Sequence, residues 1–522
     1  MKTKRQFVWN ALLLTAVTLL IRTVSVSFNV YVSNLVGAEA MGLLSLVSGI
    51  YGFAVTLATS GIHLATVRTL AARLEQTKGA ENGKCLRASL SYAAFFGTLA
   101  TLMLALAARP LGVFILKDTR TVRALYMLAF TLLPIALTSV LNGYFVAVRR
   151  AWKNAVSQLS EQFLKIMLTS YLLVFVAPKT TEGCVLAILA GGAVSESFSL
   201  VLNIVLYLID KRRFRGITPI RNGRSPAVSR IALPLAISAY ARSGLLAIEH
   251  ILIPRGLLSF GAGNSAALSA YGALHSMALP VVLYPAAVMS AFAGLLIPEI
   301  TEQESANNHR EIRYIAGRVY QMTLLFSIGC AAIMLCFSGK LGNTLYHNPQ
   351  VADFIRALAP LIPVMYLDTA TDALLKGLGQ QVYSMNVNIL DALTSVICVA
   401  IFVPRMGIAG CVLTIYVTEL LNLALSITRL LRISGFRPRV FHLVIRPLFA
   451  AVGAVSLLEL VFRLVPALGA LPLFVQIALS ALLYVFLLRI TGTFAKKDTR
   501  WLMGFFRVAL PRHGPAKSNF VT

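Results

Sequence analysis

The sequence predicts an all-α integral membrane protein of about fourteen transmembrane helices, built as two pseudosymmetric six-helix lobes followed by two C-terminal helices. Three observations predict this fold. The 522-residue chain is 57% hydrophobic and only 13% charged, its basic residues are distributed unevenly between alternate loops, and its first half resembles its second. Soluble domains carry about 25% charged residues, so the apolar residues here exceed what a single buried core requires.

Apolar runs long enough to cross a bilayer recur along the chain. A helix rises 1.5 Å per residue, so about twenty apolar residues cross the hydrocarbon core. The sequence lacks the period-2 alternation of transmembrane β-strands, so helices are expected. The predicted spans lie near 8–36, 40–72, 87–108, 122–148, 154–177, 184–209, 231–257, 266–298, 319–338, 354–376, 383–403, 407–429, 446–465 and 468–489. The basic start imitates a signal peptide, but thirteen further spans identify the first span as a transmembrane helix.

The distribution of basic residues sets the predicted orientation. With a cytoplasmic N-terminus, 34 of the 47 Lys and Arg residues fall on cytoplasmic segments, 10 on external segments and three inside spans. This positive-inside bias predicts a multi-pass protein of the cell membrane with both termini cytoplasmic. The net charge of +27 is therefore interpreted as contact with lipid headgroups, and no nucleic-acid partner is expected.

An internal repeat, shifted by about 220 to 230 residues, predicts the two lobes. Arg22 is followed seven residues later by Asn29, and Arg242 is followed at the same distance by Glu249. Seven residues are two helical turns, so each pair shares one helix face. Other matches are Ser195-Glu196 with Thr418-Glu419 and Gly183-Cys184-Val185-Leu186 with Gly410-Cys411-Val412-Leu413. Leucine-rich helices always align a little, but matched charges at apolar depth are much rarer, which favours a duplication.

The repeat gives the predicted domain boundaries. Six spans are an even number, so the two copies begin on the same side of the membrane and are related by an axis along its normal. The expected division is an N-lobe of spans 1–6 (residues 1–215), a C-lobe of spans 7–12 (216–440), and spans 13–14 with a basic cytoplasmic tail (441–522).

Several short motifs, taken in their order and spacing, resemble one known family. They are Gly37-Ala38-Glu39-Ala40-Met41-Gly42 with Ile50-Tyr51, Leu57-Ala58-Thr59-Ser60-Gly61-Ile62, Ala278-Leu279-Pro280 through Pro298-Glu299-Ile300, and Lys376-Gly377-Leu378-Gly379-Gln380 followed by Gly407-Ile408-Ala409-Gly410. The chain resembles the stage V sporulation protein B family of the multidrug/oligosaccharidyl-lipid/polysaccharide (MOP) exporter superfamily, from the first span to the twelfth.

The resemblance implies a flippase, which moves an undecaprenyl-diphosphate-linked saccharide, such as a peptidoglycan or polysaccharide precursor, from the cytoplasmic to the outer leaflet by alternating access. The family is similar to the lipid II flippases. In their pattern the first-helix arginine is followed six residues later by a second arginine, and Phe28 stands there in this chain. The resemblance therefore does not single out lipid II as the substrate.

Three cations lie at apolar depth, namely Arg22, Lys165 and Arg242. Each costs about 2.5–3.5 kcal/mol at the centre of a span, so each needs compensation. We expect them to line a central cavity and to bind the substrate diphosphate, because a guanidinium fork matches phosphate oxygens. The alternative is internal ion pairing, which Glu161 offers to Lys165 one helical turn away.

Carboxylates at apolar depth are candidates for coupling or gating. Asp368 and Asp372 lie one turn apart on one helix face, and Glu249 follows Arg242. Such groups could couple transport to Na⁺, H⁺ or the membrane potential. Alternatively, they pair with Arg242 or Arg356 and hold the lobes in register.

Neither a catalytic site nor a metal site is predicted, and no cofactor is expected beyond a possible coupling ion. The six cysteines are scattered, and the histidines lack a third ligand at metal spacing. No nucleophile–base pair or nucleotide-binding glycine loop occurs, so an enzyme is not expected. The alternatives are a cation-coupled multidrug exporter of the same superfamily, or a membrane-embedded ligase or acyltransferase. The expected partners of this monomer are a lipid-linked sugar and membrane lipids.

Overall fold

The computed structural model describes residues 2–59, 61–76, 83–213, 228–435, 441–466, 471–494 and 498. Within these ranges the chain is almost entirely helical and contains no strand. Thirteen helical stretches are long and apolar enough to span a membrane. The first, Ala16–Ala71, has 56 residues, more than twice the roughly 20 that one crossing needs. It bends at Gly37 and therefore supplies two crossings, which brings the total to fourteen and confirms the predicted fold class.

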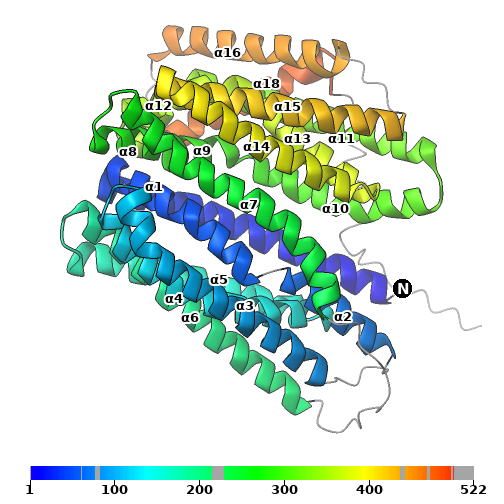
Figure 1. Ribbon diagram of the computed structural model, residues 1–522. Helices are drawn as coiled ribbons and strands as arrows, with labels where there is room; N and C mark the ends of the chain where they lie inside the picture. The colour runs from blue at the N-terminus through cyan, green and yellow to red at the C-terminus, as the bar shows by residue number, and fades with distance from the viewer. Residues whose placement is uncertain are drawn as a thin grey trace, which may run out of the picture.

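The helices are arranged in two layers, with the N-terminal half of the chain in one and most of the C-terminal half in the other (Figure 1). The first layer comprises α1 (Lys2–Thr59), α2 (Ile62–Gln76), α3 (Gly83–Pro110), α4 (Arg120–Ala147), α5 (Ala151–Tyr171) and α6 (Thr181–Arg213). The second comprises α7 (Val228–Ser259), α8 (Asn264–Gly272), α9 (Leu279–Leu283), α10 (Ala286–Ser305), α11 (His309–Tyr346), α12 (Pro349–Leu358), α13 (Ile362–Gly377), α14 (Gln381–Met406) and α15 (Ile408–Ser434).

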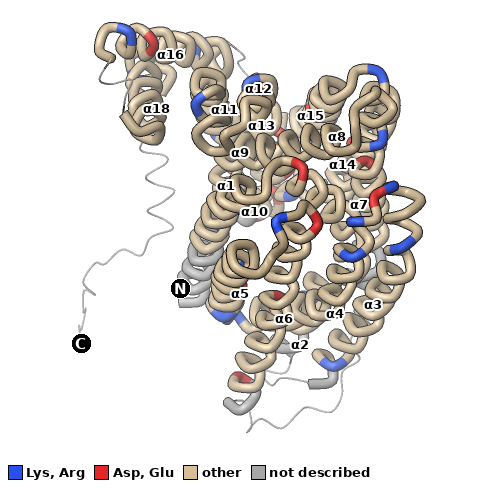
Figure 2. Tube along the Cα trace, turned by 90° about the vertical axis from the view of Figure 1, so that its left-hand side faces the viewer, with Lys and Arg blue, Asp and Glu red and all other residues tan. Residues whose placement is uncertain are grey.

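Two further helices, α16 (Arg446–Leu464) and α18 (Leu473–Ile490), lie at one edge of the molecule, outside both layers (Figure 2). Tyr484 of α18 donates a hydrogen bond to the Leu325 carbonyl of α11 at 2.9 Å. Of the predicted basic tail, which begins at Thr491, the structure describes only residues 491–494 and 498. Asp498 is buried and forms an ion pair with Arg318 of α11.

Small residues allow helices of the first layer to pack closely. Ala93, Ala100 and Ala136 are fully or almost fully buried. A methyl group added at Gly97 of α3 would lie 3.0 Å from the Ala136 side chain of α4. Close packing of small residues is the usual basis of helix association in lipid, where no hydrophobic driving force acts between helices.

Glycine and proline interrupt the helices at defined places. Gly37 has φ 79° and ψ 172°, a conformation that disfavours other residues, and there α1 reverses from the first crossing into the second. The predicted eighth span is divided into α8, a π-helical turn (Ala273–Ala278), α9 and α10, with Pro285 at the last break. Pro360 and Pro363 accompany a second break, between α12 and α13. By contrast, Pro134 lies inside a continuous α4.

Candidate functional site

Arg242 of α7 lies beside two carboxylates that come from two other helices. It interacts electrostatically with Asp368 of α13 and with Asp391 of α14. Arg242 is exposed, whereas both aspartates are partly buried. Asp368 Oδ2 accepts a hydrogen bond from Asn422 at 3.4 Å. Its Oδ1 is buried without a hydrogen-bond partner, so this carboxylate retains a free acceptor at membrane depth.

Asp372 lies one turn beyond Asp368 but is fully engaged by its own surroundings. Its Oδ2 accepts from Lys376 Nζ at 2.5 Å, an i, i+4 pair along α13. Its Oδ1 accepts from the Ser384 hydroxyl. The suggestion that Arg356 pairs with the aspartates is not what the structure shows, since Arg356 Nε donates to the Ser338 hydroxyl at 3.2 Å.

The surroundings of Arg242 are more acidic than expected from the sequence, which predicted a cavity lined by cations that bind a diphosphate. Glu249 lies near Asp391 and Ser395, and Glu419 lies near Asp368 and Asp391. We refer to Arg242, Glu249, Asp368, Asp372, Lys376, Asp391 and Glu419 as the C-layer cluster. Its five carboxylates outnumber its two cations, so its oxygen atoms can attract a further cation or proton.

Lys165 of α5 belongs to a separate group in the first layer, which we call the N-layer cluster. Lys165 and Glu161 both interact electrostatically with Glu196 of α6. Tyr51 of α1 faces the same two carboxylates and bonds to the Thr131 hydroxyl of α4 at 2.5 Å between oxygens. Lys165 therefore has acidic neighbours on two helices, and one of them is Glu161, the partner suggested by the sequence. The N-layer cluster thus comprises Tyr51, Glu161, Lys165 and Glu196.

Arg22 lies apart from both clusters, where α1 meets the break between α9 and α10. Its Nη2 donates to the Leu283 carbonyl at 3.3 Å. Because of the break at Pro285, the Ala287 N–H bonds to Tyr284 rather than to Leu283, which leaves the Leu283 carbonyl free to accept. The next residue, Thr23, shares a hydrogen bond with the Tyr284 hydroxyl at 3.0 Å.

On the side of the bend at Gly37, charged and polar contacts join the two layers. Arg120 of α4 forms ion pairs with Asp118 at 2.7 Å and with Glu39 of α1 at 2.8 Å. The second oxygen of Glu39 accepts from the Ser265 hydroxyl of α8 at 2.6 Å. Arg255 of α7 donates to the Phe114 carbonyl at 3.2 Å. We call Asp118, Arg120, Glu39 and Ser265 the latch.

Next to the latch, the backbones of α1 and α8 are in direct contact. A Cβ atom added at Gly42 would lie 1.9 Å from the Leu268 carbonyl oxygen, and one at Gly272 would lie 2.2 Å from the Ala38 carbonyl oxygen. Ser276 adds a hydrogen bond to the Met41 carbonyl at 3.0 Å. Neither glycine can be replaced while this closure is maintained.

Asn29 and Asn34 of α1 extend the closure along the first crossing. Asn29 donates to the Ser276 carbonyl at 3.1 Å, and Asn34 donates to the Leu345 carbonyl of α11 at 2.7 Å. Asn29 shares a helix face with Arg22 as predicted by spacing, yet its observed partner is a backbone carbonyl of the other layer. The two layers are thus joined along most of α1 on this side.

The structure therefore brings together only some of the predicted site residues. Arg242, Glu249, Asp368 and Asp372 lie in one cluster, Lys165 lies in a second, and Arg22 lies at the boundary between the layers. The latch residues were missed in the sequence, where Arg120 was counted only as an external charge. The one signal in the sequence is that the external segment around Arg120 is unusually basic. Four of the ten basic residues on external segments lie in it or at its ends, namely Arg109, Lys117, Arg120 and Arg123. Among the described residues, no group of three His, Cys, Asp or Glu side chains is arranged to hold a metal ion.

Comparison with known proteins identifies relatives over most of the chain. A family model described as polysaccharide biosynthesis protein matches residues 7–302. Stage V sporulation protein B of Bacillus subtilis (strain 168) is 24% identical over 419 residues, which cover 79% of this chain and 81% of that protein.

Two solved structures share the fold. The lipid II flippase MurJ in an inward closed conformation has a TM-score of 0.65 at 10% identity, over 92% of this chain and 98% of that one. An inward-facing multidrug resistance MATE family transporter of the MOP superfamily has a TM-score of 0.60 at 15% identity, over 80% of this chain and 96% of that one. At these identities the likeness shows the fold alone.

Proposed function

Because this chain belongs to the polysaccharide biosynthesis protein family, whose model matches more than half of its length, we propose that it is a flippase for an undecaprenyl-diphosphate-linked saccharide. It is a multi-pass membrane protein with the fold of MOP-superfamily transporters. In this proposal it acts as a monomer without catalytic chemistry, with both termini cytoplasmic, and moves its substrate from the cytoplasmic to the outer leaflet by alternating access.

The observation that carries the proposal is that exposed cations lie at membrane depth on both layers. Arg22 and Arg242 are exposed in the middle of long helices, and Lys165 is partly buried. Guanidinium groups facing hydrocarbon would be costly, so their exposure favours a wet space between the layers. A diphosphate is the part of a lipid-linked sugar that such groups would bind.

The closed side supports alternating access. The bend at Gly37 is predicted to be external, and the latch and the Gly42–Gly272 contact join the layers there. In this state a substrate would enter from the cytoplasmic side. Release to the outer leaflet would require these contacts to break while others form on the cytoplasmic side.

The direct test is to deplete the protein and to measure undecaprenyl-linked intermediates by mass spectrometry, sorted by membrane leaflet. We expect one diphosphate-linked saccharide to accumulate in the cytoplasmic leaflet. An unchanged distribution of every such intermediate between the leaflets would contradict the proposal.

We further propose that Asp368 couples transport to a cation gradient, with Asp372 and Glu249 as supporting groups. Asp368 has a free buried oxygen, whereas Lys376 and Ser384 occupy both oxygens of Asp372. The replacement Asp368→Asn should therefore remove the dependence of transport on Na⁺ or pH, and Asp372→Asn should weaken it less. Transport by proteoliposomes would be measured with and without each gradient. Asp353→Asn, at an exposed external carboxylate, is the control, and full ion dependence in Asp368→Asn would contradict this role.

The latch gives a further prediction. Glu39→Ala removes the contacts to Arg120 and Ser265, and the side chains of Glu39 and Arg120 are 29% and 28% exposed. Of these two contacts, the Glu39–Ser265 hydrogen bond is the one that joins the first layer to the second. A hydrogen bond contributes about 0.5–1.5 kcal/mol, so its loss should shift the equilibrium by roughly two- to tenfold toward external opening. Labelling of a cysteine at Ser276 by an impermeant maleimide should accelerate accordingly. Asp353→Ala should leave the rate unchanged, and an unchanged rate in Glu39→Ala would show that the latch does not hold the gate.

A cation-coupled multidrug exporter is the second candidate, favoured by one observation. The C-layer cluster has more carboxylates than cations, which suits a cationic ligand better than a diphosphate. If cationic drugs, but no undecaprenyl-linked lipid, were transported by the purified protein in proteoliposomes, this second function would replace the first.

A further inference from the structure

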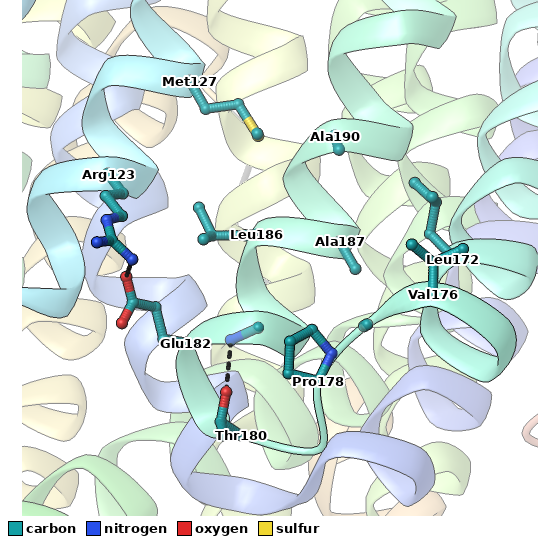
Figure 3. Close-up of a pocket in the computed structure, with 12 residues that line it drawn as sticks. Arg123, Met127, Leu172, Val176, Pro178, Thr180, Glu182, Leu186, Ala187 and Ala190 are labelled. Carbon is teal, nitrogen blue, oxygen red and sulfur yellow. Dashed lines mark hydrogen bonds and ion pairs between the residues drawn. The ribbon is translucent and has the colours of Figure 1, made fainter.

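A groove of about 350 Å³ lies near the start of α6, and none of its lining residues belongs to either charged cluster. It is formed by α4, by the start of α6 and by the π-helical turn that follows α5 (Leu172–Val176), as Figure 3 shows. Its volume lies within the range of about 300–1,000 Å³ that is typical of ligand pockets. Its walls are mostly apolar, and they include Met127, Leu172, Val176, Leu186 and Ala190.

The groove opens toward the lipid. Ala187 and Ala190 line it from α6, and the same helix face continues with Val194, Phe198 and Val201, whose side chains are 51%, 42% and 58% exposed. On α4, Phe130 lies one turn below Met127 and is 77% exposed. Large apolar side chains this exposed in a transmembrane helix face hydrocarbon. An apolar chain from the bilayer can therefore enter the groove sideways.

Charges of both signs mark one end of the groove. Arg123 of α4 pairs with Glu182 of α6 at 3.3 Å, and both residues line the groove (Figure 3). The arginine side chain is 76% exposed and the glutamate is 29% exposed. Lys179 is exposed in the loop between Pro178 and Thr180, two other lining residues. This end lies on the predicted external side, at the level of the outer headgroups.

We propose that the groove binds a phospholipid of the outer leaflet whose headgroup carries both a phosphate and a primary ammonium group, namely phosphatidylethanolamine. The phosphate would replace Glu182 as the partner of Arg123 and would also attract Lys179, while the ammonium group would pair with Glu182. One acyl chain would lie along the apolar walls. The Arg123–Glu182 pair thus complements both charges of one headgroup. This site is independent of the proposed transport function.

The test is native mass spectrometry of the purified full-length protein after incubation with an equimolar mixture of phosphatidylethanolamine, phosphatidylcholine and phosphatidylglycerol. We expect phosphatidylethanolamine to be retained preferentially, because the methyl groups of choline prevent hydrogen bonding to Glu182 and glycerol carries no positive charge. Glu182→Gln should reduce the preference for ethanolamine over choline by about fivefold. Arg123→Ala should reduce the retention of all three lipids.

Matched controls separate this site from general effects. Arg109→Ala and Asp353→Asn change exposed external charges that do not line the groove, and neither should alter retention. Ala190→Phe should fill the groove and abolish retention while leaving the Arg123–Glu182 pair in place. Equal retention of the three lipids by the unaltered protein, or unchanged retention in Ala190→Phe, would overturn the proposal. Preferential retention of phosphatidylglycerol would also overturn it.

Discussion

Replacing Gly42 with alanine should prevent external closure and reduce transport more than the same replacement at any other glycine that the structure describes. The new Cβ atom would lie 1.9 Å from the Leu268 carbonyl oxygen. This oxygen belongs to the backbone of α8, so no side-chain rotation can relieve the clash. Relief requires α1 and α8 to separate. Overpacking of this kind costs about 1–3 kcal/mol, which shifts a two-state equilibrium by roughly 5- to 150-fold.

Two measurements distinguish a trapped transporter from a misfolded one. Impermeant labelling of a cysteine at Ser276 should become faster, while the yield and the size-exclusion profile of the protein stay unchanged. Gly52→Ala is the matched control, because Gly52 lies on the same helix and its added methyl group meets no atom within 4 Å. Native labelling and native transport in a well-folded Gly42→Ala protein would show that this contact is not part of the gate.

The fold could be predicted from sequence to a greater extent than the site. Composition and the length of the apolar runs were sufficient to predict about fourteen helical crossings, since hydrocarbon admits few other structures. They could not predict that the first two crossings meet at a sharp bend at Gly37 with no loop between them, or that Pro285 breaks a span whereas Pro134 does not. These outcomes depend on which neighbouring groups bond to the released carbonyls, as Arg22 does at Leu283.

The site was harder because side-chain partners come from distant parts of the chain. Spacing placed Asp368 and Asp372 on one helix face, but only the structure shows that Asp372 is engaged by Lys376 and Ser384 while Asp368 keeps a free oxygen. The latch joins Glu39 to Ser265 across 226 positions of the chain. Nothing in the local sequence connects these two residues.

The largest effect on transport is expected from the two arginines at membrane depth. The sequence repeat pairs Arg22 with Arg242, although the structure places them at different sites. Arg22 donates to a single carbonyl at 3.3 Å, and Arg242 interacts with Asp368 and Asp391. A diphosphate is a stronger acceptor than a carbonyl. It would replace the Leu283 carbonyl as the hydrogen-bond acceptor of Arg22, and it would compete with the two aspartates for Arg242. Binding would therefore be coupled to movement of α1 and α7.

Substitution of these arginines should therefore impair transport in a graded way. Arg→Lys retains the charge but loses the bidentate fork, and Arg→Ala loses both. A hydrogen bond to a charged group contributes about 1.5–3 kcal/mol, so each alanine variant should lose roughly 10- to 150-fold in transport. The lysine variants should retain intermediate rates. The measurement is translocation of a fluorescent undecaprenyl-diphosphate-linked sugar in proteoliposomes, with Arg405→Ala, at an exposed arginine in the last turn of α14, as the control. If Arg22→Ala and Arg242→Ala both insert normally and move the lipid at the native rate, the arginines are structural, because a clamp on the diphosphate could not survive the loss of either guanidinium group.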